Sequence, residues 1–349
     1  MSGVGLLVGT YTGLGRAGGA HRFVAADVHG LLMVLGFLGL LIALERAITI
    51  GTRAAYLAPT MTAVATLALA TPLPRIMGGL LLTAAGTLVT VSYVRDLRSP
   101  STAAVLLSSG AAAWAAGAAL WTGGSGPILI TPLLAAVLVL TILGFRLRDG
   151  RLGLPDRAVY RRLMFTPTAV FAAGVAITPI TRPLGLVIAG IGLLAQVPWL
   201  LWWDASRTEL RLGGLTSFAA RSTLAAYVWL GVSGAFWIAI GLGATGALFH
   251  DALVHALFLG FVLSWLMGHA PSFVPALVGS GPVDLPIRYL PLALLQLSVA
   301  LRIGADLAGS YPWREIALHG NVMALFAFAF IEFVAARRGR RLVQRRALA

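Results

Sequence analysis

Long apolar segments recur along the whole chain, and they limit its fold more than any other feature. A helix needs about 20 mostly apolar residues to cross the hydrocarbon core of a bilayer. Eleven windows of this kind cover residues 24–44, 55–71, 76–94, 102–121, 127–145, 163–180, 184–203, 221–243, 250–269, 287–307 and 316–336. The sequence therefore predicts an all-α integral membrane protein, a polytopic helical bundle with about 11 transmembrane helices.

The composition agrees with this interpretation. Hydrophobic residues make up 58% of the chain and charged residues only 11%, whereas roughly 25% of the residues of a soluble domain are charged. No long soluble stretch separates the windows, and no shift in composition marks a boundary. We therefore expect residues 1–349 to form a single polytopic membrane domain whose main partner is the lipid bilayer.

The N-terminal segment, residues 1–22, does not fit a complete span. Its apolar part, GLLVGTYTGL at 5–14, is too short to cross a membrane and lacks the basic region of a secretory signal. Two interpretations remain open. The segment lies at the membrane surface, or it is the second half of a helix that begins upstream, in which case the complete protein has 12 spans.

The basic residues indicate the orientation. All 26 are arginines, and such an excess of positive charge can indicate a nucleic-acid partner. Here, however, twenty fall on one side of the predicted spans and six on the other, so we expect no nucleic acid. Because cytoplasmic loops carry the excess of Arg and Lys, we expect a multi-pass protein of the bacterial inner membrane. Its C-terminus, with a basic tail at 337–349, would be cytoplasmic. The six arginines on the outer side are Arg16, Arg22, Arg75, Arg182, Arg302 and Arg314.

The chain contains no cysteine. Disulfides, thiolate metal sites, iron–sulfur clusters and covalently attached c-type haem are therefore excluded. Any metal or cofactor must be held by other side chains.

Three of the six histidines occupy the same local frame. HGLLM at 29–33 recurs as HGNVM at 319–323, and VHAL at 254–257 resembles both. All three spans are predicted to run inward, so His29, His255 and His319 should lie at similar depth near the outer surface. Imidazole binds copper, iron and zinc, and the frame predicts a metal or haem site held by these three, with His250 slightly above as a further metal ligand. The alternative is that imidazole rings simply favour the interface, as Trp and Tyr do.

Two methionines follow the repeated histidines at helical spacing. Met33 and Met323 stand four residues after His29 and His319, which places each on the same helix face as its histidine. A thioether can bind Cu(I) or act as an axial haem ligand, so both are candidate secondary ligands. Methionine also fills irregular apolar gaps, and that alternative stays open.

A second polar layer is expected near the inner surface, formed by Glu45, Arg46, His269 and Glu332. It is a candidate proton path, although Glu45 and Arg46 could equally form an ion pair at a helix end. In a regular helix His269 lies within about 40° of the face of His255, and Glu45 about 160° from that of His29. Pro271 and Pro275 are expected to end the helix after His269, whose alternative role is a helix-end cap.

The segments HGLLMVLGFLGLLIALERA at 29–47 and HALFLGFVLSWLMGHAPSFVPAL at 255–277, with the HGNVM helix, resemble the NnrS family. These are bacterial polytopic proteins associated with haem, copper and defence against nitric oxide. The middle spans match only in hydrophobic character. The resemblance implies a membrane protein with haem b, and copper as a further metal, that binds nitric oxide and protects against nitrosative stress.

If the protein is an enzyme, the resemblance implies an oxidoreductase acting on nitric oxide. That reaction needs an electron donor, and the chain has no NAD, flavin or c-haem motif to supply one. Two other classes stay open. A copper-handling or assembly factor would use the same histidines, and a secondary transporter would show Gly- or Pro-broken spans in paired positions. The short N-terminal segment departs from the family pattern and indicates a missing helix or a distinct subgroup.

Overall fold

The computed structural model describes residues 28–99, 101–152, 158–277 and 279–348, and it is helical throughout this part of the chain. Each of the eleven apolar windows coincides with a helix. Nine of the described helices are long and apolar enough to cross a membrane. The windows at 55–71 and 163–180 give shorter apolar helices, Leu57–Ala70 and Phe165–Ile177. A helical membrane protein is thus confirmed, whereas the described residues do not confirm all eleven predicted spans.

The chain divides into two compact units, residues 1–149 and 150–349. The first unit begins with one continuous helix in three parts, followed by a short turn and further helices. Its elements are α2 (His29–Leu31), η2 (Leu32–Gly39), α3 (Leu40–Ile50), η3 (Arg53–Tyr56), α4 (Leu57–Ala70), α5 (Arg75–Val94), η4 (Arg95–Arg98), α6 (Thr102–Thr122) and α7 (Pro127–Arg148).

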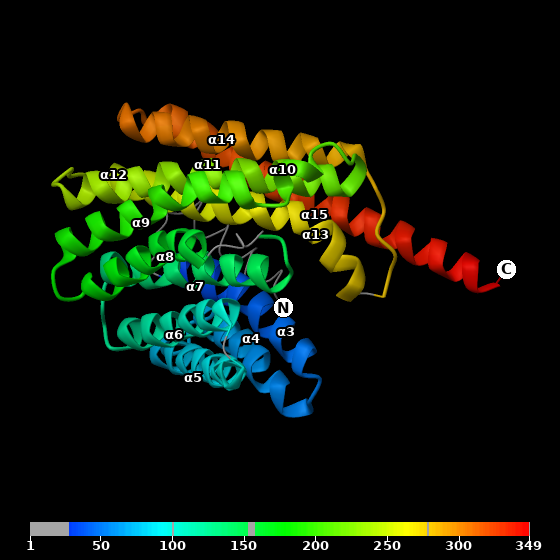
Figure 1. Cartoon of the computed structure of the whole chain (residues 1–349), viewed down its shortest axis with the longest axis horizontal. Coiled ribbons are helices and arrows are strands. Elements are labelled where there is room, and N and C mark those ends of the chain that lie inside the picture. The colour runs from blue at the N-terminus through cyan, green and yellow to red at the C-terminus, as the bar shows by residue number, and fades with distance from the viewer. Residues whose placement is uncertain (1–27, 100, 153–157, 278, 349) are drawn as a thin grey trace. The chain divides into compact units, whose positions relative to one another are not determined.

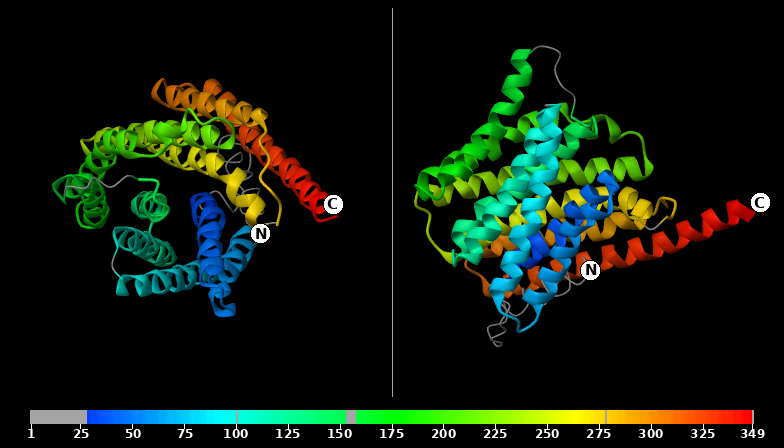
Figure 2. Two further views of the ribbon diagram at one scale, coloured as in Figure 1. Left: turned by 45° about the vertical axis from the view of Figure 1, so that its right-hand side comes forward. Right: turned by 90° about the horizontal axis from the view of Figure 1, so that it is seen from below.

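The second unit contains the longer helices. Its C-terminal helix continues past the ends of α13 and α14 in Figures 1 and 2. The elements are α8 (Ala158–Ile177), α9 (Arg182–Trp203), α10 (Ser206–Glu209), α11 (Gly214–Gly241), α12 (Ala247–His255), η5 (Ala256–Leu263), α13 (Ser264–Leu277), η6 (Pro286–Arg288), α14 (Tyr289–Leu307) and α15 (Tyr311–Leu348).

Glycines let neighbouring helices approach closely within each unit. In the first unit α5, α6 and α7 lie side by side (Figure 1), and a Cβ at Gly86 of α5 would come within 2.9 Å of the Ala115 nitrogen of α6. In the second, a Cβ at Gly190 of α9 would come within 2.6 Å of the Gly234 oxygen of α11. Small residues at such contacts are typical of helices packed inside a membrane, where no hydrophobic effect drives them together.

Two spans contain a π-helix directly after a repeated histidine. The π-helix η2 begins three residues after His29, and η5 begins at the residue after His255. Each runs for 8 residues, although π-helices are rare and occur often at functional sites. Both contain a glycine against a neighbouring side chain: a Cβ at Gly36 would lie 2.9 Å from Thr66 Oγ1, and one at Gly260 would lie 2.5 Å from the Trp229 ring.

The π-helices change which residues share a helix face. Their i→i+5 hydrogen bonds place about one extra residue in the turn, so everything beyond is rotated by about 100° relative to a regular helix. One such shift would change the angle between the faces of His255 and His269 from about 40° to about 140°, and that between the faces of His29 and Glu45 from about 160° to about 60°. The angles expected for a regular helix therefore do not apply across η2 and η5.

The short N-terminal segment, 1–22, and the question of a twelfth span lie outside the described residues. The division into two units does not test the expectation of a single membrane domain.

Candidate functional site

Five charged or titratable side chains meet at one end of the second unit. They come from three helices, α12, α14 and α15, whose other buried residues are mostly apolar, and they lie near the ends of these helices. We call them the Asp251 cluster: Asp251 and His255 on α12, Arg302 and Asp306 on α14, and Arg314 on α15.

Asp251 is the centre of this cluster. Its Oδ2 atom accepts hydrogen bonds from Arg302 Nε at 3.1 Å and Arg302 Nη2 at 2.8 Å. Arg314 Nη2 lies 3.0 Å from the same oxygen. The side chain of Arg302 is only 6% exposed and that of Asp251 22% exposed. A charge so poorly hydrated must be paired, because an isolated ion in this environment costs several kcal/mol.

Asp306 is the most deeply buried member, with a side chain that is 0% exposed. Its Oδ1 atom lies 2.9 Å from Arg314 Nε, but the N–H does not point along that line, so the contact is an ion pair without an aligned hydrogen bond. The two carboxylates of the cluster therefore balance its two guanidiniums formally.

The imidazole of His255 is oriented by Asp251. Its Nδ1 lies 2.7 Å from the Asp251 backbone oxygen and 3.3 Å from the Asp251 carboxylate. A carbonyl oxygen can only accept, so Nδ1 carries the hydrogen. In the neutral ring the lone pair is then on Nε2. A metal-binding histidine usually donates its other ring N–H to a carbonyl or a carboxylate, as His255 does here.

Two further histidines form the same hydrogen bond, from Nδ1 to the backbone oxygen four residues earlier. His319 Nδ1 lies 2.8 Å from the Glu315 oxygen, and His269 Nδ1 lies 2.8 Å from the Trp265 oxygen. Both therefore present Nε2 as the lone-pair nitrogen when neutral. His319 is exposed, whereas the ring of His269 stacks on Trp265 with centroids 4.3 Å apart.

The ion pair between Asp251 and Arg314 joins α12 to α15, the helices that carry His255 and His319. His255 follows Asp251 by four residues and His319 follows Arg314 by five, so each histidine lies about one turn further along its helix than the ion pair. The third histidine of the frame, His29, belongs to the first unit.

The remaining candidate ligands are scattered. His29 and His250 are half-buried, and each has an interaction within the chain. Met33 lies half-buried in η2, and Met323 is 60% exposed. Within the described parts of the chain no group of three or more His, Asp or Glu residues is arranged to hold a metal ion. The predicted histidine and methionine ligands therefore do not form a three-ligand metal centre within the described residues.

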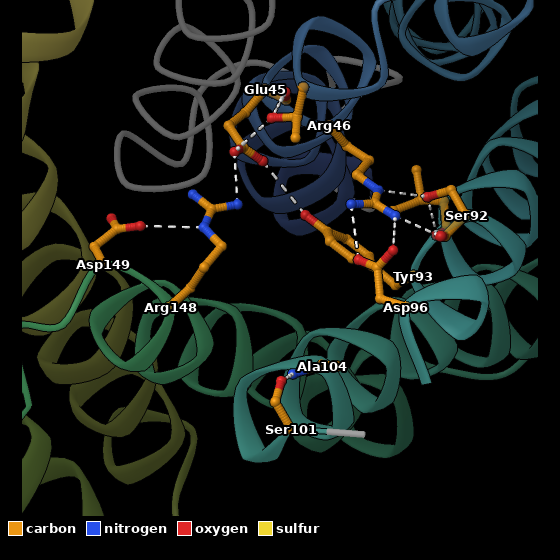
Figure 3. Close-up of polar contacts among 11 residues, drawn as sticks. Glu45, Arg46, Ser92, Tyr93, Asp96, Ser101, Ala104, Arg148 and Asp149 are labelled. Atoms are coloured by element: carbon orange, nitrogen blue, oxygen red, sulfur yellow. Dashed lines mark hydrogen bonds and ion pairs between the residues drawn. The ribbon is translucent and has the colours of Figure 1, made fainter. Parts of the chain in front are cut away.

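The predicted inner polar layer contains two separate arrangements. In the first unit, Glu45 and Arg46 have different partners (Figure 3). Arg46 pairs with Asp96, at 2.9 Å from Oδ2 and 3.0 Å from Oδ1, and also donates to the Ser92 backbone oxygen at 2.5 Å. Its guanidinium lies 4.3 Å from the centre of the Tyr93 ring. We call these four residues, Arg46, Ser92, Tyr93 and Asp96, the Arg46 cluster.

Glu45 points the other way, toward α7. Its Oε1 accepts a hydrogen bond from Arg148 at 2.8 Å, and its Oε2 lies 3.4 Å from the Tyr93 hydroxyl. The Arg148 side chain is 37% exposed. Both residues of the predicted helix-end pair are therefore ion-paired, but with partners on other helices.

In the second unit, Glu332 forms a buried ion pair with Arg288, whose Nε lies 2.5 Å from Glu332 Oε1. The two side chains are 8% and 1% exposed, and Arg288 also donates to the Val283 oxygen at 2.6 Å. His269 does not end its helix, because α13 continues through Pro271 and Pro275 to Leu277. Its predicted role as a helix-end cap is therefore wrong.

The sequence gives one local signal for the Asp251 cluster that was missed. Asp251 precedes His255 by four residues, the spacing at which side chains on a helix meet. Arg302 and Arg314 could be predicted only as outer-side arginines, because their common partner depends on how α12, α14 and α15 pack.

No curated protein and no solved structure matches the chain. A family model does match it, over residues 1–337, and that family is described as a domain of unknown function, DUF8744. Because the match covers nearly all of the chain, this all-helical membrane protein belongs to the DUF8744 family.

Proposed function

We propose that this protein binds haem b within the membrane through neutral histidines near the outer ends of its spans, and that the haem binds nitric oxide. The cofactor and the gas come from the resemblance of three segments to the NnrS family. Copper is a further metal in this proposal. The protein would protect a bacterium against nitrosative stress by binding nitric oxide at its inner membrane.

The observation that carries the proposal is the hydrogen bond on Nδ1 of His255. Iron and copper bind the lone pair of a neutral imidazole, and the carbonyl of Asp251 at 2.7 Å assigns that lone pair to Nε2. His319 has the same arrangement, with its Nδ1 2.8 Å from the Glu315 oxygen. The donor chemistry therefore fits an axial haem ligand, and the Asp251 carboxylate would increase the basicity of the ligating imidazole.

The residues divide into distinct roles in this proposal. His255 and His319 would hold the cofactor, with His250 as a further ligand from the predicted set. Asp251 would orient His255. The bound iron would supply the site that takes up a diatomic gas. A gas that dissolves in lipid could reach such a site laterally, because it lies within the membrane rather than in an aqueous cleft.

The absorption spectrum of detergent-purified protein tests this proposal first, together with its haem and copper content. We expect an intense haem band that shifts when the reduced protein is titrated with nitric oxide. Tightly bound copper without haem would instead support a copper-handling factor. Neither haem nor metal would leave a transporter as the better interpretation.

Single substitutions then test the ligands. His255→Ala and His319→Ala should each lower the haem content or alter the spectrum, because each removes a nitrogen ligand of the iron. His269→Ala is the matched control, since His269 has the same Nδ1 hydrogen bond but stands fourteen residues after His255 on the same span. If both ligand variants fold and retain the haem and copper of the unmodified protein, the assignment is wrong, and the HG..M repeat reflects helix packing.

A further inference from the structure

A pocket in the first unit lies where α3, α5 and the turn between α3 and α4 meet. Its walls include Ala43 and Ala47 of α3 and Leu88 and Val91 of α5. Two arginines also line it, Arg46 of α3 and Arg95 at the start of η4. The pocket therefore combines an apolar wall with cations at one end, and it shares no residue with the Asp251 cluster.

The apolar wall faces the surroundings of the helices. Leu88 is 40% exposed and Val91 47% exposed, and both belong to the candidate span Arg75–Arg98. Exposed aliphatic side chains on a span contact lipid acyl chains rather than water. A ligand seated against this wall must accordingly have an apolar tail.

The two arginines differ in how many of their side-chain N–H groups already have a partner. Arg46 is 8% exposed, and four of its five N–H groups are directed to Ser92 and Asp96. The Arg95 side chain is exposed, and it makes no ion pair or hydrogen bond with any residue that the structure describes. All five of its donors are therefore available to a ligand.

The charge at this end of the pocket favours an anion. Asp96 neutralises Arg46, which leaves the positive charge of Arg95 uncompensated. Arg53 of η3 is a further exposed arginine, and it stands between Thr52 and Ala54, which line the pocket. Its side chain forms no ion pair or hydrogen bond with a described residue. Basic pockets between transmembrane helices on the cytoplasmic side are sites for anionic lipid headgroups, and the arginine distribution places this end on that side.

We propose that this pocket binds an anionic phospholipid, with the headgroup phosphate at Arg95 and an acyl chain along Leu88 and Val91. Arg46 is a positioning residue: its contacts with Asp96 and Tyr93 hold α3 against the end of α5, where Arg95 follows. A free phosphate lacks the tail that the apolar wall requires, and a zwitterionic lipid lacks the net charge that Arg95 requires.

The test compares lipids added to the delipidated, detergent-purified full chain, with bound lipid measured by native mass spectrometry. Phosphatidylglycerol should bind in preference to phosphatidylcholine of the same acyl chains, and glycerol phosphate should not compete. Arg95→Gln should weaken phosphatidylglycerol binding about fivefold, the effect of one basic residue near a membrane surface. Arg98→Gln is the matched control, because Arg98 is exposed on the same turn but does not line the pocket.

Several outcomes would overturn this site. Equal loss of phosphatidylglycerol from the Arg95 and Arg98 variants would show only general attraction to a basic surface. Equal binding of phosphatidylcholine would remove the role of the charge, and competition by glycerol phosphate would show a site for a soluble anion. The thermal midpoint of each variant in neutral detergent checks that it is folded. Haem content plays no part in the readout, so this proposal and the proposed function can fail independently.

Discussion

The Nδ1 atom of His255 lies 2.7 Å from the backbone oxygen of Asp251, and the carboxylate of the same residue, 3.3 Å away, is also held by two arginines. One aspartate thus orients a histidine and forms ion pairs with both Arg302 and Arg314. This double role makes Asp251 the residue on which the cluster depends most.

Replacing Asp251 with Asn keeps the shape of the side chain and removes its charge. The Arg302 side chain, which is 6% exposed, would then lose its ion pair with the Asp251 carboxylate. Breaking one side of a buried ion pair costs about 3 to 5 kcal/mol, and because Asp251 is 22% exposed we expect the low end, about 3 kcal/mol. Chemical unfolding in detergent measures this change in the free energy of unfolding.

Asp149→Asn is the control for that measurement. Asp149 also contacts an arginine, Arg148 at 3.1 Å, but its side chain is 54% exposed. An exposed pair contributes about 0 to 1 kcal/mol. Similar losses in the two variants would show that the Asp251 cluster is no more than a solvated surface pair.

The π-helix at η5 can be tested through Gly260. A Cβ there would lie 2.5 Å from the Trp229 ring, which packs against this helix and donates through Nε1 to Gln296. Overpacking of this kind costs about 1 to 3 kcal/mol, so Gly260→Ala should lower the thermal midpoint and, by moving η5, disturb the haem spectrum through His255.

Gly304→Ala in α14 provides the comparison. No heavy atom lies within 4 Å of its added Cβ, and alanine is favoured over glycine in a helix by up to about 1 kcal/mol. We expect this variant to be neutral or slightly stabilised. A stabilised Gly260→Ala variant would contradict the close contact with Trp229.

The sequence predicts the helices well and their internal geometry poorly. Hydropathy alone locates each helix, because every lipid-facing backbone must satisfy its own hydrogen bonds. It carries no signal for η2 and η5, since a switch from i→i+4 to i→i+5 bonding depends on what packs against the helix. Thr66 and Trp229 come from other helices and meet Gly36 and Gly260 only in the fold.

The ion-pair partners show the same limit. Arg46 stands beside Glu45 in the chain, yet pairs with Asp96, fifty residues away in sequence. Adjacent residues on a helix point about 100° apart, so the choice of partner depends on which neighbouring helix each side chain faces. His255 and Asp251 are the exception, because a spacing of four residues places both on one helix face.

Arg46→Lys tests whether the fork of the guanidinium matters. The substitution keeps the charge but cannot pair with both oxygens of Asp96, bond to Ser92 and cover the Tyr93 ring at once. We expect a loss of about 1 to 2 kcal/mol in the free energy of unfolding. Arg148→Lys should change it by less than about 0.5 kcal/mol, since the Arg148 side chain is 37% exposed and that of Arg46 only 10%. Equal effects would mean that the Arg46 cluster contributes only its charge.

The arginine asymmetry predicts the orientation. A reporter active only in the cytoplasm should be active when fused after Ala349 and silent when inserted in the loop at Gly246, between α11 and α12. The physical reason is the preference of arginine-rich loops for the cytoplasmic side. The reverse pattern would place His255 and His319 at the inner surface and the lipid pocket at the outer one.

The buried pair between Arg288 and Glu332 gives the sharpest stability prediction. With side chains only 1% and 8% exposed, removal of either partner leaves a buried charge, so Arg288→Met and Glu332→Leu should each cost about 3 to 5 kcal/mol. The double variant should cost much less than the sum, because no charge is then left unpaired. A double-mutant cycle on detergent-purified protein measures this coupling. If the two single losses simply add, the residues act independently, and Glu332 becomes free to serve in the inner proton path that the sequence suggested.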